Sequence, residues 1–229
     1  MTIDSGLTIL IGQNGAGKST LIDALGGLGR LKDGDVQLEG ASPYGGAGGR
    51  KRFMRRIGLV PQDVLLPDGA RVDDAVRYAG WLKGMTRSAV DSKLESALGS
   101  LQVEDLRRRR IGTLSGGEKR RISIAVSLIH EPAVLILDEP TAGLDPIQRS
   151  ALQQLLARLA AKHAVLVSTH LVEDIGPGVN RVVALGAGKI SFDGTVEELR
   201  GKATATATGD SDLERGVWNV LSDPDGATW

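Results

Sequence analysis

The chain reads Gly12-Gln13-Asn14-Gly15-Ala16-Gly17-Lys18-Ser19-Thr20 directly after an apolar run at residues 7–11 and directly before an apolar-periodic segment. A buried strand that enters a glycine-rich turn and leaves it as a helix points several backbone N–H groups at one spot. The positive end of the helix dipole faces the same spot. These nine residues therefore predict a strand, a phosphate-binding loop and a helix.

The residue types within this loop fit a nucleoside triphosphate with Mg²⁺. Gly12, Gly15 and Gly17 allow the backbone to approach a phosphate closely, because no side chain stands in the way. Lys18 is placed to reach the β- and γ-phosphates, and Ser19 to offer its hydroxyl to Mg²⁺. The alternative is an ordinary glycine-rich turn between two core elements. The G-x-x-x-x-G-K-[ST] spacing and its strand and helix context favour the phosphate loop.

Composition narrows the classes of protein to consider. The 229 residues include 28 basic and 28 acidic side chains, so the net charge is zero and no nucleic-acid partner is expected. Basic runs at residues 50–56 and 107–110 are interpreted as solvated surface. The absence of cysteine excludes disulfides and thiol chemistry. The start shows no secretion signal, and no apolar run approaches the ~20 residues of a membrane span, so we expect a soluble, cytoplasmic chain.

Apolar runs alternate with helical patterns, which predicts an α/β fold with a mostly parallel sheet. Buried strands are expected at residues 7–11, 57–60, 133–137 and 164–167, and a further strand at 36–38 after the turn Asp33-Gly34-Asp35. Residues 182–185 and 189–192 predict a hairpin. Helices are expected at residues 72–82 and 89–101. Two further core-facing helices are expected from apolar residues at helical spacing: one from Ile122, Ala125, Val126 and Ile129, and one from Leu152, Leu155, Leu156 and Leu159.

Two further segments bear on the domain organisation. Residues 63–130 interrupt the strand pattern, and we interpret them as a helical subdomain inserted into the α/β domain of residues 1–201. Residues 202–229 form a C-terminal tail in which alternating Ala and Thr fit a surface linker better than a weak edge strand.

Two short motifs carry the remaining chemistry. In Leu114-Ser115-Gly116-Gly117-Glu118, backbone donors ahead of a helix face an anion, although an ordinary N-cap at Ser115 explains the same residues. The strand at 133–137 runs into Asp138 and Glu139. An acid at this point matches the Mg²⁺-holding aspartate of phosphate-loop enzymes, and its neighbour stands where a catalytic base orients water. A helix cap or surface turn is the alternative reading of the two carboxylates.

These motifs together resemble the nucleotide-binding domain of ABC transporters, from about residue 7 to residue 200. Residues 12–19 are similar to the Walker A loop, Gln62 to the Q-loop glutamine, and residues 114–118 to the family signature. Asp138 matches the Walker B aspartate, Glu139 the catalytic glutamate, Asp145 the D-loop aspartate, and His170 the switch histidine. The order of the motifs is that of the family, which implies a P-loop NTPase core. His130 and His163 have no such context and are interpreted as ordinary side chains.

The resemblance also implies a mechanism and partners. ATP with Mg²⁺ would lie between the Walker A loop of one protomer and Ser115, Gly116 and Gly117 of a second, so ATP would complete a dimer. Glu139 would polarise the attacking water and His170 would contact the γ-phosphate. Gln62 would touch Mg²⁺ and link the site to integral-membrane permease subunits. The chain would then act at the inner face of the cell membrane, and its motif wording looks most like exporters with separate permeases.

One part of the family pattern is not found. The family places an aromatic residue upstream of Walker A, within a small antiparallel β-subdomain, to stack on adenine, and no residue before Gly12 is aromatic. We therefore expect a truncated N-terminal β-subdomain, through a late start codon or a shortened chain. Two other functions stay open: a non-transport ABC ATPase, and a nucleotide-binding scaffold with impaired turnover.

Overall fold

A computed structural model describes residues 1–29, 31–63 and 66–222. Within them, one six-stranded sheet has the order β2-β3-β4-β1-β5-β6. Its strands are β1 (Gly6–Ile11), β2 (Ile57–Val60), β3 (Val134–Asp138), β4 (Ala164–Thr169), β5 (Val179–Gly186) and β6 (Lys189–Gly194). All neighbours pair parallel except β5 and β6, which pair antiparallel. The predicted mostly parallel sheet and the hairpin are confirmed.

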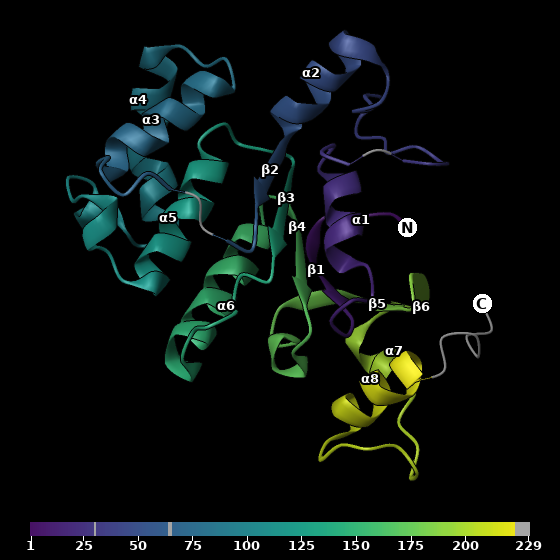
Figure 1. The fold of residues 1–229 in the computed structure, drawn as a ribbon. Coiled ribbons are helices and arrows are strands. Elements are labelled where there is room, and N and C mark those ends of the chain that lie inside the picture. The colour runs from purple at the N-terminus through teal and green to yellow at the C-terminus, as the bar shows by residue number, and fades with distance from the viewer. Residues whose placement is uncertain (30, 64–65, 223–229) are drawn as a thin grey trace.

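The described helices fall into groups around this sheet (Figure 1). They are α1 (Lys18–Leu25), α2 (Gly46–Arg56), α3 (Val72–Leu82), α4 (Arg87–Gly99), α5 (Gly116–Leu128), α6 (Pro146–Ala160), α7 (Val196–Arg200) and α8 (Asp212–Ser222). Helices α3, α4 and α5, which fall within residues 63–130, pack on one another beside the β2 edge. The division into a core and an inserted subdomain stays a prediction. Residues 64 and 65, in the expected insertion, lie outside the described residues. None of the described helices is both long and apolar enough to cross a membrane.

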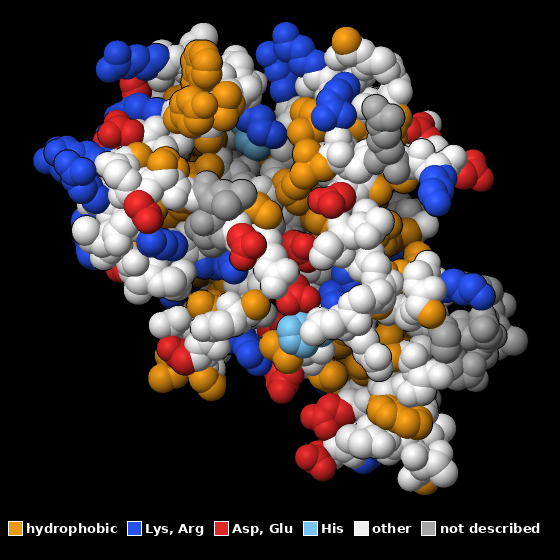
Figure 2. Space-filling view, viewed as in Figure 1, with side chains coloured by type: hydrophobic (Ala, Val, Ile, Leu, Met, Phe, Trp, Pro, Cys, Tyr) orange, Lys and Arg blue, Asp and Glu red, His pale blue; other side chains and the backbone are white. Residues whose placement is uncertain are grey.

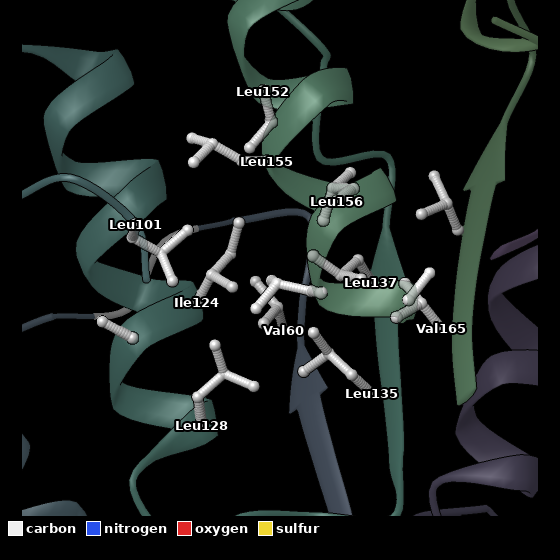
Figure 3. Packing of buried hydrophobic residues seen from close by; sticks show 14 of the residues in the cluster. Val60, Leu101, Ile124, Leu128, Leu135, Leu137, Leu152, Leu155, Leu156 and Val165 are labelled. Atoms are coloured by element: carbon white, nitrogen blue, oxygen red, sulfur yellow. The ribbon is translucent and has the colours of Figure 1, made fainter. Parts of the chain in front are cut away.

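Alternate residues of each central strand enter two separate cores, because successive side chains point to opposite faces of a sheet. On one face, Leu135 and Leu137 pack with the larger core under α5 and α6. Figure 3 shows this packing, with strand side chains facing Leu152, Leu155 and Leu156 of α6. On the other face, Val134 and Ile136 pack with a second core that includes residues of α1 and α2. Burial of both faces explains why these strands are continuously apolar.

The strand expected at residues 36–38 is wrong. Leu38 forms only an isolated antiparallel bridge to Ala41. The carboxyl group of Asp35 accepts hydrogen bonds from the Val36 amide (2.8 Å), the Gln37 side chain (3.2 Å) and the Ser42 hydroxyl. Such local side-chain hydrogen bonds offer the backbone an alternative to a sheet ladder, and residues 36 and 37 belong to no strand.

The C-terminal segment contains a helix that the periodicity analysis did not predict. Residues 203–209 contain a turn and no strand, and their role as a linker stays a prediction. Helix α8 then packs on α7 and β5 and buries Val217 and Val220. Residues 223–229 of the expected tail lie outside the described residues, and the division at residue 201 stays a prediction.

Candidate nucleotide-binding site

The loop between β1 and α1 has the backbone shape that a phosphate-binding turn requires. Gly17 precedes α1 with φ of +100°, a conformation open to glycine and strained for other residues. At Gly12 an added Cβ would lie 2.4 Å from the carbonyl oxygen of Leu185, so only glycine fits between the loop and β5. In the described part of the chain, the amides of Gly15 and Gly17 donate to no protein oxygen. These amides are therefore free to bind an anion.

Lys18 is buried beneath this loop, with only 5% of its surface exposed. Its ammonium donates to the carbonyl oxygens of Gly12 (2.8 Å) and Gln13 (3.2 Å), which closes the loop around it. A third neighbour is the Oε1 atom of Glu139, 3.5 Å away. The positive charge is thus fixed in place at the floor of the loop before any ligand arrives.

Two adjacent carboxylates end strand β3. Asp138 is buried and accepts a hydrogen bond from the Ser168 hydroxyl of the neighbouring strand β4. The same Ser168 oxygen accepts the amide N–H of Glu139 at 3.0 Å. Glu139 has φ of +43°, a left-handed conformation that costs a non-glycine residue about 1–3 kcal/mol and is concentrated at functional sites. This turn aims the Glu139 side chain toward Lys18.

Glu139 also meets His170, which follows β4. The His170 Nδ1 atom lies 3.2 Å from Glu139 Oε2, while Lys18 Nζ lies near the other carboxylate oxygen. The Glu139 side chain is 12% exposed and that of His170 is 35% exposed. Parallel pairing of β3 with β4 brings the two turns together, because the carboxyl ends of both strands lie at the same edge of the sheet.

These groups surround one cavity of about 560 Å³. Its lining residues come from the phosphate loop, the turn after β2, the end of β3 and the end of β4: Asn14, Gly15, Gly17, Lys18, Ser19, Thr20, Gln62, Glu139, Ala142 and His170. In the space-filling view, acidic, basic and histidine side chains gather near the centre of this face (Figure 2). Among the other expected site residues, Gly12, Gln13 and Ala16 complete the loop, and Asp138 lies behind Glu139.

The structure does not bring every expected residue to this cavity. Ser115, Gly116 and Gly117 form the start of α5, and Asp145 is the N-cap of α6, where its carboxylate accepts the Gln148 amide at 2.8 Å. None of these four residues lines the cavity. The first turns of α5 and α6 lie close to each other instead, since a Cβ at Gly117 would lie 3.0 Å from the Gln148 side chain.

The start of α5 is also a well-formed N-cap, as the alternative reading of the sequence proposed. The Ser115 hydroxyl accepts the Glu118 amide at 3.3 Å, and Glu118 Oε2 accepts the Ser115 amide at 2.7 Å. The hydrogen bond from the Ser115 backbone lowers the pKa of Glu118 below its ordinary value. Ser115 and Gly116 are nevertheless exposed, with open space beyond Gly116. The start of α5 is thus both an N-cap and an exposed helix N-terminus, and its contact with an anion stays a prediction.

The donor set around the cavity fits a triphosphate with Mg²⁺. The loop offers free amides and an ammonium, which suit phosphate oxygens. Ser19 and Gln62 supply neutral oxygen atoms to the cavity and Asp138 a carboxylate behind it. Within the described ranges no cluster of three or more His, Cys, Asp or Glu could hold a metal ion by itself. Mg²⁺ suits such a site, because it commonly binds one or two protein oxygens together with phosphates and water.

Ser168 is a site residue that the motifs did not single out. It is fully buried in β4 and connects Asp138 to the Glu139 backbone. A signal was present in the sequence, because a serine within an otherwise apolar strand needs a polar partner. Only the pairing of β3 with β4 reveals which partner it has.

The fold and the site together define an ATP hydrolase of the phosphate-loop class. A family model described as ABC transporter matches residues 1–142. The chain belongs to the ABC transporter family, of which it represents the ATP-binding and ATP-hydrolysing part.

Relatives and solved structures agree with this assignment. The chain is 33% identical over 196 residues to ABC transporter A family member 2 of Arabidopsis thaliana, covering 86% of this chain and 20% of that protein. It is 34% identical over 191 residues to the ABC transporter ATP-binding protein YxlF of Bacillus subtilis, and this match covers 83% of this chain and 62% of YxlF. CbiO1 of Clostridium perfringens, part of the ABC transporter complex cbiONQ, superimposes with a TM-score of 0.80 at 29% identity, covering 88% and 82%. The chain spans less than two thirds of the length of the Arabidopsis and Bacillus relatives.

Proposed function

We propose that this chain is the ATP-binding and ATP-hydrolysing subunit of a membrane transporter, and that ATP-dependent dimerisation drives the transport cycle. The observation that carries the proposal is the single cavity in which the phosphate loop, Gln62, Glu139 and His170 converge. In this cavity the Glu139 carboxylate lies beside the loop that is proposed to bind the phosphates.

The residues support hydrolysis by activation of water. Lys18 and the loop amides would hold the β- and γ-phosphates. Mg²⁺, held by Ser19 and Gln62 with Asp138 behind them, would offset charge on the phosphate oxygens. Glu139 would accept a proton from water as the water oxygen bonds to the γ-phosphorus. The bond from that phosphorus to the bridging oxygen then breaks, and ADP leaves. His170, which lies at the Glu139 oxygen that does not face Lys18, would orient the water and the γ-phosphate.

The exposed start of α5 supports a two-protomer site. Ser115 and Gly116 present an exposed helix N-terminus that does not line the chain's own cavity. Such a terminus favours a negative charge. A second protomer's γ-phosphate would supply that charge, and its loss on hydrolysis would weaken the dimer.

An exposed apolar surface on α3 supports a protein partner. Tyr78, Trp81 and Leu82 are 60%, 66% and 61% exposed, and the two aromatic rings stack with centroids 5.9 Å apart. Figure 2 shows hydrophobic side chains gathered over α3 and α4 at the top of the molecule. Exposed apolar groups of this size mark interaction sites. We propose that permease subunits dock there, on the inner face of the cell membrane.

The relatives support the transport role, and the motif wording supports its direction. CbiO1 is part of a transporter complex, and a mouse relative that is 33% identical over 196 residues is named a phospholipid-transporting ATPase. The segments 140–146 and 168–174 look most like those of exporters with separate permeases. We propose export on that basis.

Two measurements test the function together. The purified chain should release phosphate from Mg-ATP, and it should co-purify with an integral membrane protein from its own source. Phosphate release without any membrane partner would favour a non-transport ABC ATPase. ATP binding without phosphate release, even in the presence of the permease, would favour the scaffold and overturn the proposal.

The α3 surface gives a more local prediction. Trp81→Ala should lower stimulation of hydrolysis by the reconstituted permease about tenfold or more, because aromatic anchors dominate protein interfaces. Hydrolysis by the isolated chain should stay within about twofold. Trp218→Ala is the matched control, since Trp218 is also exposed, on α8 at the far end of the molecule. Equal stimulation of both variants would remove α3 from the interface.

A further inference from the structure

A buried carboxyl group lies directly behind the two turns that carry Glu139 and His170. Asp174 is 3% exposed and ends a short 3₁₀ helix, Val172–Asp174, that follows β4. Its carboxyl oxygens accept hydrogen bonds from three side chains on three different segments: Thr141, Thr169 and Gln153. It does not line the nucleotide cavity, and in the described residues it has no ion-pair partner.

The Thr141 contact reaches the turn that carries Glu139. The Thr141 hydroxyl donates to Asp174 Oδ2 at 2.7 Å. Thr141 is two residues beyond Glu139, and in this turn the Ala142 amide donates to the Glu139 carbonyl oxygen at 3.2 Å. A displacement of Thr141 would therefore shift the Glu139 backbone with it.

The Thr169 contact reaches the turn that carries His170. The Thr169 hydroxyl donates to the same Oδ2 atom of Asp174 and accepts the Leu171 amide at 3.0 Å. It thus connects the residues on either side of His170. One carboxyl oxygen therefore holds both turns, whose side chains meet at 3.2 Å between His170 Nδ1 and Glu139 Oε2.

Gln153 of α6 fixes the orientation of the carboxyl group. Its side-chain amide donates to Asp174 Oδ1 at 3.2 Å and to the Glu173 carbonyl oxygen at 2.8 Å. The other oxygen, Oδ2, is left facing the two threonines. The carboxyl group is therefore held by three donors at once: Thr141 in the turn after β3, Thr169 in β4 and Gln153 in α6.

We propose that Asp174 is a positioning residue for ATP hydrolysis, which fixes the distance between Glu139 and His170 through Thr141 and Thr169. This inference rests on the proposed function. A side chain that acts in this way lowers the rate of the chemical step without touching the nucleotide. A misplacement of about 1 Å remote from the chemistry can cost roughly 10²-fold in rate.

The first test separates positioning from a structural role. Asp174→Asn keeps the size of the side chain but replaces one acceptor oxygen with a donor. It should lower kcat about 10- to 100-fold and change the Kd for Mg-ATP less than about threefold. Glu173→Gln is the matched control, because Glu173 is the adjacent acid and is exposed. A structural residue would instead lower Tm and nucleotide affinity together, and that result would overturn the proposal.

Thr169→Val and Thr141→Val keep the test valid if Asp174→Asn does not fold. Each removes one hydroxyl donor and preserves the shape of the side chain closely. Each should lower kcat by a smaller factor than Asp174→Asn, again with Mg-ATP affinity retained. Unchanged kcat in both threonine variants would overturn the proposal.

A double-mutant cycle gives the sharpest test. In a His170→Ala background, Asp174→Asn should lower the single-turnover rate by a smaller factor than it does in the parent chain, because one of the two groups that it positions is gone. A full, multiplicative loss in that background would overturn the proposal. The wild-type rate distinguishes the proposed function from the positioning role of Asp174. A wild-type chain that does not hydrolyse ATP contradicts the proposed function, whereas normal hydrolysis by Asp174→Asn contradicts the positioning role alone.

Discussion

At the scale of single residues, the cavity is organised by charges and hydrogen bonds that are set before a ligand binds. Lys18 is held by two carbonyl oxygens and lies 3.5 Å from Glu139, which in turn lies 3.2 Å from His170. Motif spacing predicts which residues take part. It does not predict the left-handed backbone of Glu139 or the role of Ser168, because both depend on how β3 pairs with β4.

Lys18→Ala should weaken the binding of Mg-ATP by about 10- to 100-fold, because hydrogen bonds to charged groups contribute about 1.5–3 kcal/mol each. The loss should appear in the Kd measured by calorimetry or with a fluorescent nucleotide. Lys162→Ala serves as the control, since Lys162 is exposed and lies outside the cavity. An unchanged Kd for Lys18→Ala would show that the ammonium does not contact phosphate.

At the scale of helices and strands, periodicity predicts the elements that face a core. The strand at Ile57–Val60 and the helix at Val72–Leu82 have the expected bounds, because an apolar pattern alone defines them. Helix α2 was not predicted, since three glycines and five basic residues hide its buried Phe53. Helix α8 carried a readable signal: Leu213, Val217, Val220 and Leu221 have helical spacing. The alternating Ala and Thr residues before it have no such spacing and favour a linker.

One partly buried histidine joins the helical segment to the sheet and gives stability a pH dependence. His130, just after α5, bonds the Ile57 carbonyl oxygen at 3.0 Å, and Lys83 at the end of α3 donates to the same oxygen at 2.9 Å. Burial lowers the pKa of His130 to about 4, and the charge of Lys83 adds to the shift. The unfolded state binds the proton more readily than the folded state does. The contribution of neutral His130 to the stability of the folded state is therefore complete above pH ~6.5 and is lost as pH falls toward 4.

The free energy of unfolding should therefore decrease by up to about 2 kcal/mol between pH 7 and pH 5 through this residue. Urea titrations at both pH values should show a smaller decrease for His130→Gln than for the parent chain. His163→Gln should keep the parental decrease. If His130→Gln retains the full pH dependence, the His130 imidazole is not its source.

At the scale of the whole molecule, the residues that the motifs single out do not all meet in one place. The phosphate loop, Glu139 and His170 line one cavity, whereas Ser115 and Asp145 begin two helices outside it. The sequence places all of these motifs in family order, but it cannot show which of them one chain brings together. That depends on the packing of α5 and α6 against the sheet.

Ser115→Arg should leave ATP binding by the monomer unchanged and prevent dimerisation with ATP, because the added bulk lies where a second protomer's nucleotide is proposed to bind. The change also removes a helix cap, at a cost of about 1 kcal/mol. Thr86→Arg controls for that loss, since Thr86 caps α4 by accepting the Ala89 amide. Sedimentation velocity with Mg-ATP should show monomers for Ser115→Arg and dimers for Thr86→Arg. Dimers in both would place the interface elsewhere.

The central claim is that this cavity hydrolyses ATP with Glu139 as the base, and one variant tests it directly. Glu139→Gln keeps the shape of the side chain but cannot accept the proton from water. Phosphate release per bound ATP should fall more than about 100-fold, while the Kd for Mg-ATP stays within about threefold and dimers accumulate. Phosphate release at the parental rate by Glu139→Gln would contradict the account.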